Sequence, residues 1–142
     1  MNARELISPY HVGWVGLVVG IAFAGLDALI NANPLAQRLY AAYRPIMRAS
    51  ANAGLGMTLD LVFGIVMAIL FVVLTPALPT AWVARGMVFG LIAWFFRVAM
   101  GSASSAVMFQ VPVTALLYTL ATGLVEMVIL GLIYGALLKP QR

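Results

Sequence analysis

Four ionisable side chains lie inside apolar stretches of the sequence, and they are the first candidates for chemistry. Asp27, Asp60 and Glu126 can bind a proton or a cation, and Arg97 can pair with a carboxylate. An ionisable group inside the hydrocarbon region of a bilayer costs roughly 2.5 to 3.5 kcal/mol on insertion scales. A chain that keeps four such groups is expected to pair them with one another or to use them in its function.

The depth of these groups along their apolar stretches predicts which of them meet. Asp27 lies about one helical turn before the end of the first stretch, and Asp60 lies about one turn after the start of the second. Arg97 lies about one turn before the predicted end of the third. If successive helices run up and down, the three depths coincide, and we expect Arg97 to bridge Asp27 and Asp60. The alternative is a structural salt bridge, or side chains that extend to the nearby headgroups.

Glu126 differs from the other three because it lies near the middle of the last apolar stretch. Thr119, Thr122 and Gly123 lie on or near the same helical face. As a functional residue, Glu126 would exchange a proton or bind a cation. As a structural residue, it would be a protonated acid that is hydrogen-bonded to a neighbouring helix. Both interpretations stay open at the level of the sequence.

No motif in the chain predicts an enzyme. The sequence has no Cys, which excludes disulfides, thiolate metal sites and cysteine nucleophiles. It also contains no Walker motif, nucleophile elbow or HExxH sequence. His11 is the only histidine, and a haem or metal site would lack a second one in this chain. We therefore expect no catalytic residue, no metal and no cofactor.

The composition places these residues in a membrane protein. Of 142 residues, 64% are apolar and 8% are charged, whereas about 25% are charged in a typical soluble domain. The length accommodates four spans of about 20 residues. The net charge is +4, but the eight basic residues are scattered. Their expected partner is the lipid bilayer with its anionic headgroups, and no nucleic acid.

We therefore predict an all-α membrane protein with a single domain (1–142), in which four transmembrane helices form an up-down bundle. The predicted spans are approximately 12–32, 55–75, 81–101 and 111–138. The small residues at 102–105 are expected to form a loop.

A short interfacial helix is predicted at about 34–44, between the first two spans. Asn33 can cap this helix, and Pro34 suits its first position. The residues expected at the membrane surface are Arg38, Tyr40, Tyr43, Arg44 and Arg48. Lys and Arg divide equally between the two sides of the predicted topology, so the positive-inside rule does not decide the orientation.

A glycine pattern recurs in the first and third spans at an offset of 70 residues. The first pair of glycines precedes Asp27, and the second pair precedes Arg97 by the same spacing. The pairs are Gly16 with Gly20 and Gly86 with Gly90. This recurrence predicts two similar helical hairpins arranged as parallel repeats. The alternative is a chance recurrence in a glycine-rich membrane protein.

The last span carries a further pair of packing glycines, Gly131 and Gly135. They lie on a different helical face from Glu126, so they are expected to face a second subunit or another protein. The same spacing also serves packing within one chain.

The whole chain resembles the small four-span proteins of the bacterial inner membrane. This resemblance implies a location in the bacterial inner (plasma) membrane and assigns no role to any residue. The absence of catalytic motifs and the small mass outside the membrane favour a non-catalytic subunit. Such a subunit would assemble or stabilise a membrane complex or a homo-oligomer. The alternative is a small transporter or channel for a proton, a cation or a small polar solute that uses the intramembrane carboxylates.

Overall fold

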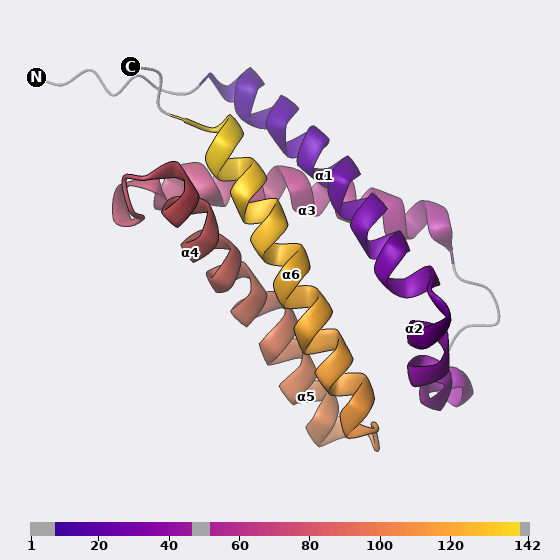
Figure 1. Cartoon of the computed structure of the whole chain (residues 1–142). Coiled ribbons are helices and arrows are strands. Elements are labelled where there is room, and N and C mark those ends of the chain that lie inside the picture. Colours follow the sequence, from indigo (N-terminus) through magenta and orange to yellow (C-terminus); the bar gives the residue numbers. More distant parts are fainter. Residues whose placement is uncertain (1–7, 47–51, 140–142) are drawn as a thin grey trace, which may run out of the picture.

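The computed structural model describes residues 8–46 and 52–139, and all regular secondary structure in these ranges is helical. The helices follow in the order α1 (Pro9–Ala32), α2 (Pro34–Leu39), the 3-10 helix η1 (Tyr40–Ile46), α3 (Ala53–Leu74), the short 3-10 helix η2 (Thr75–Ala77), α4 (Trp82–Trp94), the π-helical turn η3 (Phe95–Ala99), α5 (Met100–Met108) and α6 (Val113–Leu137). Figure 1 shows them as a bundle in which α4, η3 and α5 continue as one helix. The predicted all-α fold is confirmed.

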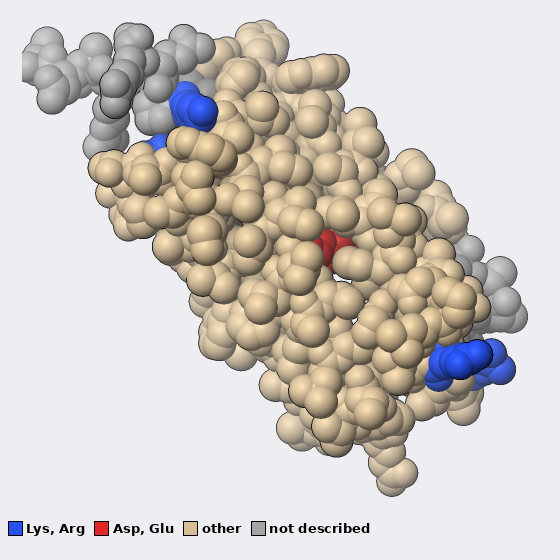
Figure 2. Space-filling model, viewed as in Figure 1, with Lys and Arg blue, Asp and Glu red and all other residues tan. Residues whose placement is uncertain are grey.

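Four helical segments are long and apolar enough to cross a membrane: Pro9–Ala32, Ala53–Ala77, Trp82–Met108 and Val113–Leu137. They make the chain a small integral membrane protein with four transmembrane helices, as predicted. Basic side chains lie at the two ends of the face shown in Figure 2, and acidic atoms lie near its middle. On this face, a broad band without basic side chains separates the two basic ends.

The third span is longer than predicted. It continues past residue 101 to Met108, so residues 102–105 are helical and do not form a loop. Of these four residues Ser102 is buried, Ser105 is partly buried, and Ala103 and Ser104 are exposed. The chain becomes extended only at Phe109, shortly before Pro112, which cannot continue the helix.

Asparagine side chains begin two of the helices. The Asn33 side chain accepts a hydrogen bond from the backbone N–H of Ala36 at 2.9 Å, directly before Pro34. Asn52 accepts one from the N–H of Leu55 at 3.0 Å. Each asparagine satisfies a backbone donor that the first turn of a helix leaves free. The predicted short helix between the first two spans is present as α2 and η1.

Two hairpins with the same glycine packing build the bundle. In the first, α1 packs on α3, and in the second, α4 packs on α6. Three glycines meet in each: Gly16, Gly20 and Gly64 in the first hairpin, and Gly86, Gly90 and Gly131 in the second. A Cβ atom on Gly64 would lie 2.5 Å from the backbone nitrogen of Gly20, and one on Gly131 would lie 2.9 Å from that of Gly90. The helices approach this closely because no side chain separates their backbones.

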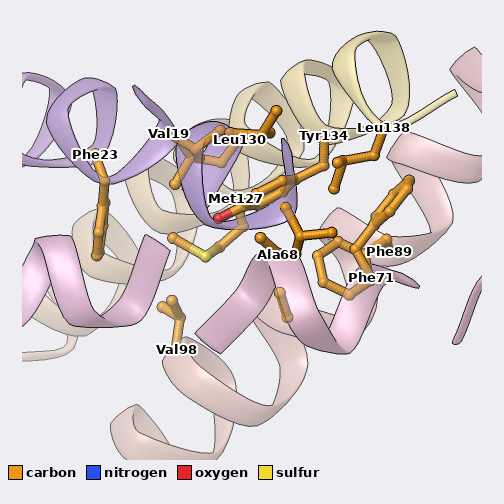
Figure 3. Packing of buried hydrophobic residues seen from close by; sticks show 13 residues of the cluster. Val19, Phe23, Ala68, Phe71, Phe89, Val98, Met127, Leu130, Tyr134 and Leu138 are labelled. Carbon is orange, nitrogen blue, oxygen red and sulfur yellow. The ribbon is translucent and has the colours of Figure 1, made fainter. Parts of the chain in front are cut away.

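The hairpins join through α1 and α6 and through an aromatic cluster. The ring of Phe71 lies 5.0 Å from that of Phe89 and 5.9 Å from that of Tyr134 (Figure 3). The Tyr134 hydroxyl donates a 2.6 Å hydrogen bond to the backbone oxygen of Gly64. These contacts hold α3 to the second hairpin in the half of the bundle that contains the α3–α4 turn.

Candidate functional site

The structure brings Arg97 of η3 and Glu126 of α6 together in the middle of the bundle. Arg97 Nη1 lies 3.9 Å from Glu126 Oε2, and this is the only ion pair within 4.0 Å among residues 8–46 and 52–139. The Glu126 side chain is 5% exposed and that of Arg97 is 32% exposed. Glu126 Oε1 is buried without a hydrogen-bond partner in the described part of the chain. An unsatisfied oxygen of this kind costs free energy and calls for an explanation.

Arg97 was predicted to bridge Asp27 and Asp60, and this prediction is wrong because its ion-pair partner is Glu126. Because the third span continues to Met108, Arg97 lies near the middle of that span and at the depth of Glu126. Its guanidinium carbon lies 4.3 Å from the centre of the Phe23 ring and 5.0 Å from that of Phe63. The aromatic faces stabilise the cation through their π electrons.

Asp27 and Asp60 nevertheless belong to the same electrostatic group. Both are partly buried, and both lie close enough to Glu126 for their charges to act on its carboxyl group. Asp27 accepts a 3.0 Å hydrogen bond from the side chain of Asn31. We call Asp27, Asp60, Arg97 and Glu126 the charged layer. Three acids and one base leave this layer net negative unless it holds protons.

The π-helical turn that carries Arg97 is held against α6 by packing. A Cβ atom on Gly123 would lie only 2.7 Å from Cγ1 of Val98, so the missing side chain makes room for Val98. One turn earlier, the Trp94 indole N–H donates a 2.9 Å hydrogen bond to the backbone oxygen of Leu120. Single π turns inside α-helices are frequent at functional sites.

A hydroxyl-lined groove of about 350 Å³ leads from Arg97 to the end of the molecule formed by α2 and η1. The polar side chains that line it are Tyr43, Arg97, Ser102, Ser105 and Thr119. We call this the hydroxyl groove. Beside it, the Tyr40 hydroxyl lies 3.0 Å from the hydroxyl of Thr119. Burial raises the pKa of Tyr40, so this hydroxyl keeps its proton at neutral pH.

On the inner side of Arg97, a cavity of about 20 Å³ lies between the hairpins. Its lining is apolar except for Arg97 and Tyr134, and it has room for a single water molecule. Glu126 also borders an apolar cleft of about 300 Å³ between α1 and α6, which Leu26 and Val125 line. The acidic atoms near the middle of the face in Figure 2 lie between these two helices.

The predicted surface residues lie at the α2 and η1 end. Arg38 and Arg44 are exposed, and Tyr40 and Tyr43 are partly buried. Arg48 lies outside the described residues. At the opposite end, the Arg85 guanidinium donates hydrogen bonds to the backbone oxygens of Pro79 and Thr80, and so it stabilises the turn before α4.

Gly131 and Gly135 do not face a partner. Both are buried against α4, and a Cβ atom on Gly135 would lie 2.5 Å from the backbone oxygen of Trp82. The expectation that they form a face for a second subunit is therefore wrong. The glycines of α4 offer a complementary surface within the same chain, which the spacing in α6 alone did not reveal.

His11 links the first turn of α1 to the last turn of α6. Its Nε2 atom lies 3.1 Å from the backbone oxygen of Leu137. Over residues 8–46 and 52–139, no group of three His, Cys, Asp or Glu side chains could hold a metal ion.

The sequence interpretation missed Ser102, Ser105 and Tyr134. Ser102 and Ser105 were assigned to a loop, and they follow Arg97 by five and eight residues, which is not the spacing of a single α-helical face, so the sequence carried no clear signal for them. Nothing local to Tyr134 predicts its hydrogen bond, because the acceptor, Gly64, lies 70 residues away.

Comparisons with protein-family models, with curated proteins and with solved structures find no match for this chain. The fold and the site define a class: a small integral membrane protein with four transmembrane helices and an ion pair in their midst.

Proposed function

We propose that this chain is a small transporter or channel, located in a bacterial inner membrane, that passes a proton or a small cation by way of Glu126. The observation that carries the proposal is the state of this one side chain. Glu126 is buried at mid-span, its Oε2 atom faces the only cation of the charged layer, and Oε1 has no partner among the described residues. An ionisable residue within a transmembrane helix indicates function unless its partners fully satisfy it.

The charged layer supplies two arrangements for one guanidinium. With Glu126 ionised, Arg97 pairs with it at 3.9 Å. With Glu126 protonated or bound to a cation, the negative charge of Asp60 still attracts the guanidinium of Arg97. The positive charge therefore keeps an acidic neighbour in either state, and the change at Glu126 does not leave an isolated charge in the membrane.

The test is ion flux through purified protein in liposomes. Proton and monovalent-cation flux are measured for wild type, Glu126→Gln and Glu126→Asp under an imposed membrane potential. Gln cannot release a proton or offer a full negative charge to a cation, so the first variant should lose the flux. Asp keeps the carboxylate and should retain part of it. Thermal melting in detergent verifies that both variants fold.

Two results would contradict the proposal. The first is the absence of flux in folded wild-type protein. The second is a folded Glu126→Gln variant that conducts like wild type, which would remove this carboxylate from the mechanism.

A non-catalytic role as a subunit of a membrane complex or as a homo-oligomer is the second candidate. It is supported by α3, which packs mainly on α1 and leaves Leu59, Val66 and Val73 exposed. Native mass spectrometry of gently solubilised protein separates the two candidates, because a stable second chain in the peak favours the subunit role.

A further inference from the structure

We propose that the hydroxyl groove is the water-filled entrance through which protons, and not metal cations, reach Glu126 from the α2 and η1 end of the molecule. The choice of the proton rests on the proposed function, whereas the existence and side of the entrance do not.

The groove has the lining of a water path. Hydroxyl groups come from three separate elements, with Tyr43 in η1, Ser102 and Ser105 in α5, and Thr119 in α6. The Thr119 hydroxyl already donates to the backbone oxygen of Ala115 and lies 3.0 Å from the Tyr40 hydroxyl. The hydroxyls of Tyr43, Ser102 and Ser105 make no hydrogen bond to a described residue, so they can donate to and accept from a file of water molecules. The inner end of the groove is Arg97, whose guanidinium makes no hydrogen bond to any described residue. Its N–H groups are free to bind water there.

The opposite half of the bundle is closed. The rings of Phe71, Phe89 and Tyr134 pack together within 6 Å of one another, and each is at most 2% exposed. They lie between the inner cavity and the end that carries Lys139, which itself stacks on Trp82. Water therefore has a path to Arg97 from one end and no comparable path from the other.

A metal cation would meet two obstacles on this path. Two unit charges 4 Å apart repel each other by about 4 kcal/mol at an effective dielectric constant of about 20. A metal cation that reached Glu126 from the groove would have to pass at about this distance from the guanidinium. It would also exchange its hydration shell for protein oxygens, yet the inner cavity of about 20 Å³ is apolar and has room for no more than one water molecule.

A proton meets the same electrostatic repulsion from the guanidinium, because its positive charge passes at the same distance. It avoids the second obstacle, since it moves from one water molecule to the next by exchange and needs neither the room of a full-sized ion nor protein oxygens in place of a hydration shell. At the end of the path, a hydronium ion gives its proton to a carboxylate oxygen of Glu126, which leaves neutral water and a carboxylic acid. Asp27 of α1, Asp60 of α3 and Arg97 of η3 are the charged groups that act on Glu126 during this step.

Single cysteines test the entrance, because the chain has none of its own. Gly101→Cys and Ser105→Cys place a thiol in the groove, and a Cβ atom on Gly101 would meet nothing within 4 Å. Arg44→Cys and Lys139→Cys mark the two ends, and Val66→Cys, on the exposed apolar side of α3, is the lipid-facing control. Each variant is reconstituted in sealed liposomes and exposed to a membrane-impermeant methanethiosulfonate from one side at a time.

Both groove thiols should react from the same side as Arg44→Cys, and at least about tenfold faster than Val66→Cys, because the reactive thiolate forms only in contact with water. Modification of Ser105→Cys should also block proton flux, and a reductant should restore it. Reaction from the Lys139 side, or at the rate of the lipid-facing control, would overturn the entrance.

Ion flux in the same liposomes tests the choice of ion. We expect proton flux without Na⁺ or K⁺ flux in wild type, and K⁺ flux that rises in Arg97→Gln. Equal K⁺ and proton flux in wild type overturns the proton assignment and leaves the proposed function in place. Reactive groove thiols without any flux overturn the proton assignment together with the proposed function, and they support the entrance alone.

Discussion

Arg97 contacts both aromatic rings and an acid, and these contacts determine how much stability is lost when it is removed. The rings of Phe23 and Phe63 flank its guanidinium, and Glu126 forms an ion pair with it. Without Arg97, no cationic side chain among the described residues lies within 4.0 Å of Glu126, while the negative charges of Asp27 and Asp60 still act on it. The residue is therefore structural as well as a candidate for function.

Arg97→Ala should lower the free energy of unfolding by about 2 to 3 kcal/mol. This is less than the full cost of breaking a buried pair, because Arg97 is partly exposed. Arg44→Ala removes an exposed charge and should change stability by less than about 0.5 kcal/mol. Thermal melts in detergent compare the two. Adding Glu126→Gln to Arg97→Ala should recover much of the loss, and equal melting temperatures for the two single variants would contradict the ion pair.

The residue types of the charged layer were predictable from the sequence, but their pairing was not. Any charge inside an apolar stretch is conspicuous, so Asp27, Asp60, Arg97 and Glu126 could all be selected. The pairing depends on depth, and depth was misjudged because Ser102 and Ser105 look like loop residues. In a membrane they continue the helix, and this moves Arg97 to the middle of its span.

At the scale of the elements, each hairpin depends on glycines that touch the backbone of the neighbouring helix. Gly16→Ala should destabilise the protein by about 1 to 3 kcal/mol, the cost of overpacking, because its Cβ would lie 2.7 Å from the Cα of Ile65. Gly13→Ala is the matched control in the same helix, with nothing within 4 Å. It should be neutral or stabilising by up to about 1 kcal/mol. Chemical or thermal unfolding in detergent measures both, and equal losses would rule out the predicted contact.

The π turn η3 permits a second experiment on an element. Deleting Phe96, which is 70% exposed, should return η3 to α-helical geometry while α4 and α5 keep their faces. The variant should fold but lose the Arg97–Glu126 pair, and with it the proton flux. Deleting Val88 from the regular part of α4 instead rotates all that follows by about 100° and should abolish folding. Circular dichroism and flux measurements compare the two deletions, and an unfolded Phe96 deletion would contradict this account of the turn.

Regular helices were predictable from apolar length, whereas the π turn was not. The residue types at positions 95–99 do not by themselves predict a π turn. It coincides with the packing of Val98 into the space at Gly123 and with the hydrogen bond from Trp94 to Leu120, and both partners lie on α6. These contacts exist only once the second hairpin has formed.

At the scale of the whole molecule, the packing of Gly135 inside the chain changes what its substitution should do. Gly135→Leu places a large side chain against the backbone of Trp82. We expect it to unfold the second hairpin and not to alter association of an otherwise folded chain. Size-exclusion chromatography with light scattering, together with thermal melting, distinguishes the two outcomes. A folded variant whose oligomeric state has changed would contradict this prediction and would indicate that these glycines contact a partner.

The number of spans and the all-helical class followed from composition, because a chain with 64% apolar residues has few other ways to satisfy its backbone in lipid. The arrangement of the hairpins did not follow. It depends on contacts such as those of Phe71 with Phe89 and of Tyr134 with Gly64. Such contacts join residues that are distant in sequence, and no periodicity in the sequence encodes them.

The shared glycine packing of the hairpins has a consequence for ancestry by duplication. Asp27 and Arg97 hold the same position in the repeated glycine pattern of the sequence, 70 residues apart, and they carry opposite charges. Two identical hairpins related by symmetry would bring two aspartates, or two arginines, to those places. A single gene copy working as a symmetric dimer could therefore not have offered one cation to the acids of the charged layer. If the two halves arose by duplication, the asymmetry on which this layer depends had to follow that event, once the two copies could diverge.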